Sequence, residues 1–182
     1  LLIVDDCPDS VHTRLSETVH RDGSRCHLIT IGVETKVQGM RRNLIVGCTL
    51  GVGVKDFGSL VTIDQNSLIS CPIGVDVYEK NFGDGGGAAV ITHSIFSKCS
   101  SIPALADSLS TLSVNYSLSD TVPITGTANI LADPLFIEPL ALNYQLRPES
   151  PAINAGDPAH PVDPDNSRAD IGALYTYSPT DY

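Results

Sequence analysis

The chain has 182 residues and a formal net charge of −10, from 21 acidic and 11 basic residues. This length suits one domain with a real hydrophobic core. Nucleic-acid binding needs clustered lysine and arginine, so the charge argues against that class and against binding to anionic membrane surfaces. No stretch reaches the roughly 20 apolar residues of a membrane-spanning helix, so we expect no membrane insertion.

Four of the five cysteines are spaced almost evenly. Cys26, Cys48, Cys71 and Cys99 are separated by 22, 23 and 28 residues. The phrases around the middle two are similar: residues 43–54 read NLIVGCTLGVGV and residues 66–77 read NSLISCPIGVDV. A period of about 20 to 30 residues that contains short apolar strands indicates a solenoid.

Equivalent cysteines on successive coils are expected to stack in the interior. Neighbouring strands lie about 4.8 Å apart, so the thiols form a ladder of small apolar side chains. A disulfide between adjacent rungs is an alternative, since bonded cysteines have Cα atoms roughly 4.4–6.8 Å apart. One ligand per coil makes a line rather than a tetrahedron, which disfavours a metal cluster. We therefore expect Cys48 and Cys71 to be neighbours, buried and without metal.

Alignment on the cysteines predicts three short strands in each coil. Val52 and Val54 alternate with glycine, and Val75 and Val77 repeat this spacing one coil later, which is typical of a strand with one buried face. The other predicted strands are 60–63 and 89–92, then 67–69 and 94–96, with 112–118 repeating both types and Cys26–Val33 opening an earlier coil.

Asn43 and Asn66 lie at equivalent corners before the third strand of their coils. Stacked asparagines hydrogen-bond along a stack and tolerate left-handed backbone geometry. Parallel strands in successive coils describe an all-β fold, a parallel β-helix, and crossover chirality favours the right hand. We predict about 22–28 residues per coil over residues 1–131. Leu1 begins an apolar strand without capping residues, which predicts upstream coils or a partner at that end.

The composition changes from Ala132, and eight of the 12 prolines lie beyond it. An open β-helix end exposes unpaired strand edges, so the terminal segment must differ from the repeats. We predict that residues 132–182 are a C-terminal cap and tail of the same domain.

Three phrases of this tail carry a family resemblance. They read ADPLF at 132–136, YQLRPESPAINAGD at 144–157 and DPDNSRADIGA at 163–173. Together they resemble the closing segment of bacterial right-handed parallel β-helix proteins, a pectate-lyase-like group. The resemblance implies the C-terminal portion of a secreted or cell-surface protein, and it indicates the fold more than one function. The chain departs from the pattern at Asn166 and Leu174, where an aspartate and an aromatic residue are usual.

Three functions are compatible with that resemblance. The first is a carbohydrate-associated or structural module without a catalytic site in this chain, whose partner is a polysaccharide or cell-surface glycan. The second is a polysaccharide lyase acting on a uronate polymer. The third is a self-stacking subunit of a surface fibre or adhesin, because an uncapped coil presents an edge for end-to-end homo-association.

The densest charged group on the predicted wall is the candidate lyase site, formed by Asp76, Glu79, Lys80 and Asp84. Lyases of this fold generally pair calcium-binding carboxylates with a basic residue. The resemblance therefore implies Lys80 as the base that removes the proton α to a carboxylate, with the three acids as cation ligands. Solvation of an exposed wall is the alternative. Asp56 and Glu79 form a weaker candidate pair for hydrolysis, which needs carboxylates about 5–9.5 Å apart.

Asp163, Asp165, Ser167 and Asp170 follow the spacing D-x-D-x-S-x-x-D. Several oxygen ligands in a proline-bounded loop suit a hard cation, so Ca²⁺ is the cofactor that the sequence predicts. The loop lacks the central glycine and final glutamate of an EF-hand. The alternative is a structural loop in which Asp170 pairs with Arg168 or accepts backbone N–H groups.

His93 lies beside Ser94 at a predicted corner. A catalytic Ser–His pair needs an oxyanion hole and an orienting acid, and the sequence identifies neither. We therefore expect a hydrogen-bonded corner histidine.

Overall fold

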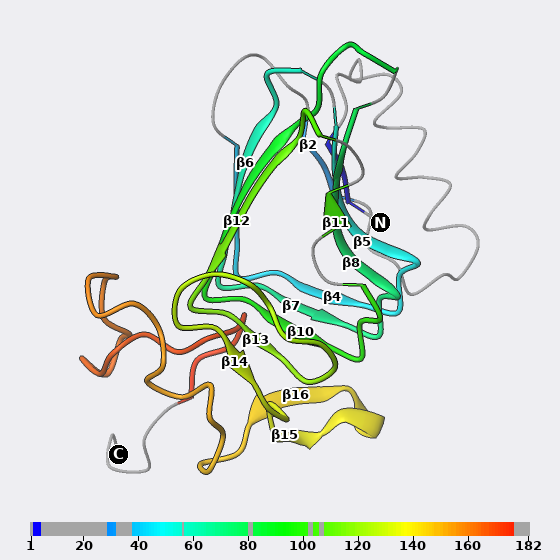
Figure 1. The fold of residues 1–182 in the computed structure, drawn as a ribbon. Coiled ribbons are helices and arrows are strands. Elements are labelled where there is room, and N and C mark those ends of the chain that lie inside the picture. The colour runs from blue at the N-terminus through cyan, green and yellow to red at the C-terminus, as the bar shows by residue number, and fades with distance from the viewer. Residues whose placement is uncertain are drawn as a thin grey trace.

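The computed structural model describes residues 2–4, 29–31, 38–55, 57–79, 82–101, 104–105 and 108–176. Over these residues the chain is all-β, with three parallel sheets and one antiparallel strand pair (Figure 1). Within the same ranges, no helix is long and apolar enough to cross a membrane.

The first sheet has the strand order β11-β8-β5-β1-β2, the second β14-β13-β10-β7-β4 and the third β12-β9-β6-β3, while β15 pairs with β16. The elements are β1 (Leu2–Val4), β2 (Ile29–Ile31), β3 (Gln38–Arg41), β4 (Leu44–Val46), β5 (Leu50–Lys55), β6 (Leu60–Asp64), β7 (Ser67–Ile69), β8 (Ile73–Tyr78), β9 (Ala88–Thr92), β10 (Ile95–Ser97), β11 (Ala104–Leu105), β12 (Thr111–Asn115), β13 (Leu118–Ser119), β14 (Ile130–Leu131), β15 (Phe136–Glu138), the 3₁₀ helix η1 (Pro139–Ala141) and β16 (Asn143–Leu146).

From β3 to β11 the chain visits the three sheets in a repeating order. β3, β4 and β5 belong to the third, second and first sheets, and the next two sets of three strands follow the same order. Equivalent strands pair in parallel, with Val52 opposite Val75 and Val54 opposite Val77. The strand positions and the register predicted from the cysteine alignment are confirmed here.

The first two strands depart from the predicted order. The alignment placed the segment after Cys26 directly before the repeat of Cys48, so β2 was expected beside β5. Instead β1 lies between them, with Leu2 opposite both Ile29 and Val52. The expectation that stacking follows chain order is wrong at this end. Both strands are short and apolar, so either fits the edge of β5.

Inward-facing side chains of the three sheets form the main core. Cys48, Cys71 and Cys99 lie in this core as free, buried thiols. Cys71 donates to the carbonyl of Ile45, and Cys99 donates to that of Leu68 in the preceding repeat. Burial raises the pKa of Cys99 to about 12. The expected ladder of buried thiols is confirmed for these three cysteines, while Cys26 lies outside the described residues.

The second sheet is covered on both faces, so every residue of β7 and β10 is buried. Its outer face carries Ile69 and Ile95, which pack in a second apolar cluster with Phe136, Tyr144 and Ile171 of the tail. We call residues 132–176 the tail, and Figure 1 shows it in yellow to red along this face. The change in composition predicts that the tail closes the end of the stack. The described part lies beside the stack instead, because the outward isoleucines need cover.

Candidate functional site

The predicted lyase group is described only in part. Three of its members lie in or after β8: Asp76, Glu79 and Asp84. Glu79 Oε2 accepts a hydrogen bond from the N–H of Gly83 at 2.8 Å, so this carboxylate holds the following turn. Lys80, the expected base, and Asp56 lie outside the described residues. The lyase and hydrolase arrangements therefore stay predictions.

Two of the predicted calcium ligands, Asp163 and Asp170, are buried in the tail and accept main-chain hydrogen bonds. Asp163 Oδ2 accepts the N–H of Asp170 at 2.7 Å. The two oxygens of Asp170 accept the N–H groups of Asn154 and Thr176 at 2.8 and 3.0 Å. Burial raises the pKa of Asp170 even though these bonds favour its ionised form. This carboxylate therefore links Asn154 and Thr176, which are distant in the tail sequence.

The other two members, Asp165 and Ser167, are partly exposed, and the Ser167 N–H donates to Asp165 Oδ1 at 2.9 Å. Arg42, which precedes β4, lies 3.4 Å from Asp163 Oδ1, so a cation already faces this carboxylate. These contacts are the ones expected of the structural-loop alternative. Calcium binding by the four residues stays a prediction.

A cluster of Asp64, His93 and His160 joins the tail to the sheets. Asp64 ends β6, His93 follows β9 at the equivalent corner, and His160 comes from the tail. Asp64 Oδ1 lies 2.8 Å from His93 Nδ1, and Asp64 Oδ2 lies 3.2 Å from His160 Nε2. One ligand-type atom of each residue lies within 4.8 Å of the others.

The hydrogen bonds of His93 define which of its nitrogens carries the proton. Its Nε2 accepts the N–H of Asp157 at 2.9 Å, so Nδ1 carries the proton and donates it to Asp64. The ring is 3% exposed. Ser94 donates its hydroxyl to the carbonyl of Thr92 rather than to His93. The expectation of a hydrogen-bonded corner histidine is confirmed.

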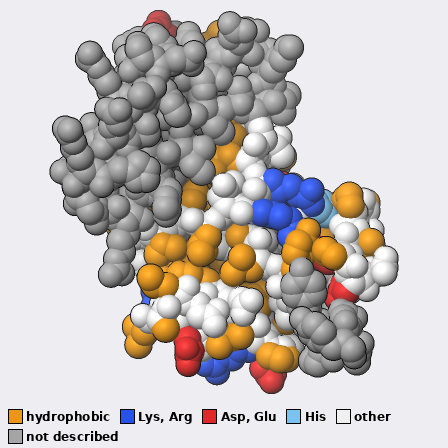
Figure 2. Space-filling view, turned by 180° about the vertical axis from the view of Figure 1, so that it is seen from behind, with side chains coloured by type: hydrophobic (Ala, Val, Ile, Leu, Met, Phe, Trp, Pro, Cys, Tyr) orange, Lys and Arg blue, Asp and Glu red, His pale blue; other side chains and the backbone are white. Residues whose placement is uncertain are grey.

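Asp64 is held as an anion. Burial disfavours its charge, but hydrogen bonds from His93, Thr92 and His160 outweigh this and lower its pKa to about 2. Arg41 Nε also lies 3.1 Å from its Oδ2. Figure 2 shows basic side chains gathered beside a histidine on this face.

Imidazole and carboxylate ligands together suit zinc rather than calcium. His93 nevertheless has no free lone pair, and the Arg41 guanidinium already balances the charge of Asp64. The cluster is therefore best described as a hydrogen-bonded clasp between the tail and the sheets.

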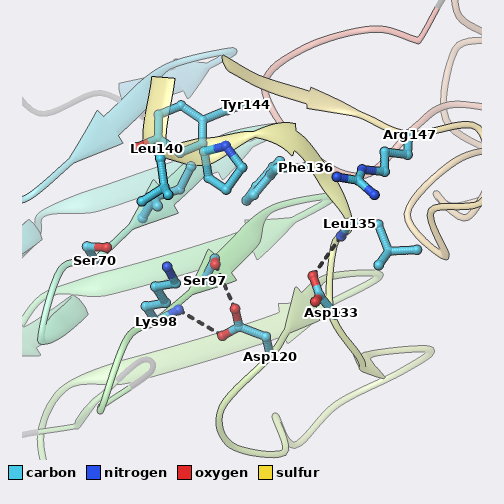
Figure 3. Close-up of a pocket in the computed structure, with 12 residues that line it drawn as sticks. Ser70, Ser97, Lys98, Asp120, Asp133, Leu135, Phe136, Leu140, Tyr144 and Arg147 are labelled. Carbon is cyan, nitrogen blue, oxygen red and sulfur yellow. Dashed lines mark hydrogen bonds between the residues drawn. The ribbon is translucent and has the colours of Figure 1, made fainter. Parts of the chain in front are cut away.

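A cleft of about 450 Å³ lies between the tail hairpin (β15, η1 and β16) and the residues at the ends of β7 and β10 (Figure 3). Its volume falls within the roughly 300–1,000 Å³ that small-molecule sites occupy. The polar residues that line it are Ser70, Ser97, Lys98, Asp120, Asp133, Tyr144 and Arg147. The cleft combines ionised and aromatic groups, which suits a polar ligand with an apolar face.

The carboxylates of the cleft are positioned by short hydrogen bonds. Asp120 accepts the hydroxyl of Ser97 at 2.6 Å and the main-chain N–H of Lys98 at 2.8 Å. Asp133 Oδ1 accepts the N–H of Leu135 at 2.8 Å. Figure 3 shows Asp120 and Lys98 across the cleft from the hairpin. These bonds hold both carboxylates at fixed places before any ligand binds.

The hairpin supplies the apolar wall. Phe136 and Tyr144 pack edge to face, with ring centroids 5.4 Å apart. Leu140 lies at the cleft and is 99% exposed, so its side chain is accessible to a ligand. The packed aromatic pair therefore forms the base of this wall, and Leu140 forms its solvent-exposed rim.

Comparison with known proteins adds no relative, because no family model, curated protein or solved structure matches the chain. The residues themselves must therefore support any functional assignment. Neither the clasp nor the cleft is predicted by a pattern in the sequence. The clasp joins Asp64 to His160 across 96 residues, and no shared motif links them.

Proposed function

We propose that residues 1–131 form a right-handed parallel β-helix and that the chain is a module of a secreted or cell-surface protein. The repeated visiting order of the three sheets and their parallel register support the β-helix. The right hand follows from the general preference of parallel crossovers. The tail phrases that resemble the pectate-lyase-like group support the extracellular setting.

The module is carbohydrate-associated and acts by binding. The cleft is the observation that carries this proposal, because it joins fixed carboxylates, two cations and an apolar hairpin wall in one small space. Carbohydrates present hydroxyl groups at their edges and C–H groups on their ring faces, and such a lining complements both.

Affinity electrophoresis of the purified chain through gels that contain neutral or uronate polysaccharides tests this function. We expect retardation by at least one polymer, with no rise in the ultraviolet absorbance that an unsaturated lyase product produces. Absence of retardation across the whole panel contradicts the binding function, and a rise in absorbance establishes the lyase alternative. Light scattering of the chain at several protein concentrations measures its mass and so distinguishes polysaccharide binding from self-stacking.

A further inference from the structure

The charges that line the cleft cancel. Asp120 and Asp133 provide two carboxylates, while Lys98 and Arg147 provide two cations, although the whole chain has a net charge of −10. An anionic ligand is attracted by one pair and repelled by the other, and the same holds for a cationic ligand. The lining therefore favours a ligand without net charge.

Several polar groups at the cleft keep hydrogen-bonding capacity. Asp133 accepts the Leu135 N–H at Oδ1, which leaves further lone pairs on this carboxylate for a ligand. Arg147 donates from Nη2 to the carbonyl of Ile137 at 3.0 Å, which leaves further N–H groups. Lys98 donates its main-chain N–H to Asp120. Among the described residues, the Lys98 ammonium makes no ion pair, and Figure 3 shows this side chain rising toward the hairpin.

Ammonium and guanidinium groups only donate hydrogen bonds, and an ionised carboxylate only accepts them. A hydroxyl group does both, so adjacent hydroxyls on one ring can accept from a cation and donate to a carboxylate. The cleft holds both kinds of group, the cations Lys98 and Arg147 and the carboxylates Asp120 and Asp133, and so matches this property. An uncharged ligand that carries only acceptors can pair with the two cations but donates nothing to either carboxylate, so it gains fewer hydrogen bonds.

The opposite wall needs an apolar surface on the same ligand. Leu140, Phe136 and Tyr144 line the hairpin side, and Leu140 is 99% exposed. The C–H face of a pyranose ring removes such a surface from water while the ring edge keeps its hydroxyls. We propose that the cleft binds an uncharged pyranose residue, with its hydroxyls between Lys98, Arg147 and Asp133 and one face against Leu140. This inference rests on the proposed carbohydrate association.

Amide chemical-shift titration with methyl glycosides and neutral oligosaccharides of glucose, galactose and mannose tests the inference. A galacturonate trimer and glucosamine are the charged comparators. We expect shifts at Lys98, Leu135 and Leu140 with at least one neutral sugar. Its Kd should change less than about twofold between 50 and 500 mM salt, since salt screens only charged pairs. The charged comparators should bind about tenfold more weakly.

Two variants test the assigned residues. Asp133→Asn and Lys98→Met should each weaken the neutral sugar about tenfold. Both positions are exposed, so the amide spectrum outside the cleft should be unchanged. Glu149→Gln removes an exposed carboxylate of the tail outside the cleft and should leave Kd unchanged.

The possible outcomes separate this inference from the function on which it rests. If both variants bind the neutral sugar with an unchanged Kd, or if the chemical shifts change elsewhere, the cleft is not the binding site. The carbohydrate association then still stands. Tighter binding of a charged comparator overturns the uncharged class. Absence of binding by every sugar and every polysaccharide overturns both.

Discussion

The side-chain amide of Asn43 donates a hydrogen bond to Oδ1 of Asn66, 23 residues later, at 2.9 Å. The main-chain N–H of Asn43 reaches the same oxygen at 2.9 Å. Nδ2 of Asn66 donates to the carbonyls of Met40 and Asp64, each at 3.0 Å. The amide stacking predicted from the sequence is therefore confirmed at this corner, and a slip of one residue between repeats breaks the three bonds that join Asn66 to Met40 and Asn43.

Replacing this amide should be costly. Asn66 is fully buried, so Asn66→Ala leaves several main-chain groups without partners and should lower the free energy of unfolding by about 3 kcal/mol. Urea denaturation followed by circular dichroism measures the loss. Gln145→Ala removes an exposed amide and should cost less than about 0.5 kcal/mol. A loss below about 1 kcal/mol in the free energy of unfolding for Asn66→Ala contradicts the role of this amide in holding the repeats together.

Close packing between repeats gives a second prediction. A Cβ atom on Gly51 lies 2.5 Å from the carbonyl oxygen of Gly74, whereas one on Gly39 meets nothing within 4 Å. Gly51→Ala should therefore lower the melting temperature, with a cost of about 2 kcal/mol or more. Gly39→Ala is the matched control in the third sheet and should be neutral within about 0.5 kcal/mol. Equal melting temperatures for the two variants contradict this packing.

Local patterns were sufficient to predict the repeating part of the fold. Val52 and Val75 each alternate with a small or polar residue, and the cysteines align them, so period and burial agree. Both signals depend on neighbours within one or two repeats. The register of β5 with β8 could therefore be read from the sequence before any long-range contact was known.

Long-range contacts could not be predicted in this way. β1 and β2 are both short apolar strands, and no residue in either indicates which of them pairs with β5. Proline content marked where the repeat stops, but it did not show which face the tail covers. Asp64 and His160 have no common motif, and the cleft exists only because the tail hairpin returns to the second sheet. Such sites depend on how segments pack, which periodicity does not report.

The clasp predicts a pH dependence of stability at acid pH. The pKa of Asp64 is lowered from 3.8 to about 2, so folding favours the ionised form. Its contribution is complete above pH 3.8 and is lost as the pH falls toward 2. At about 1.4 kcal/mol per pKa unit, it amounts to roughly 2 kcal/mol. Urea denaturation should show the parent losing about that much more than Asp64→Asn between pH 5 and pH 2. Parallel stability curves contradict the clasp.

Calcium titration tests the tail loop. Asp163 and Asp170 already accept main-chain N–H groups, so an ion must displace these bonds. We expect 1 mM Ca²⁺ to stabilise chelator-treated protein by less than about 0.4 kcal/mol, which corresponds to a Kd above about 1 mM. Differential scanning calorimetry measures the shift. A rise of about 5 °C or more that Asp165→Asn abolishes contradicts the structural role and establishes the calcium site.

The stacking of the repeats can be measured directly by oxidative cross-linking of paired cysteines on the outer face of the third sheet. Thr62 lies opposite Val90 in the register of β6 with β9, while Ala88 lies two residues away on the same face. Neighbouring strands place paired Cα atoms about 4.8 Å apart, within disulfide range, and a two-residue shift adds about 6.6 Å along the strand. The account predicts rapid disulfide formation in Thr62→Cys/Val90→Cys and none in Thr62→Cys/Ala88→Cys. Equal cross-linking in both variants, or its absence in the first, contradicts the stacked parallel fold.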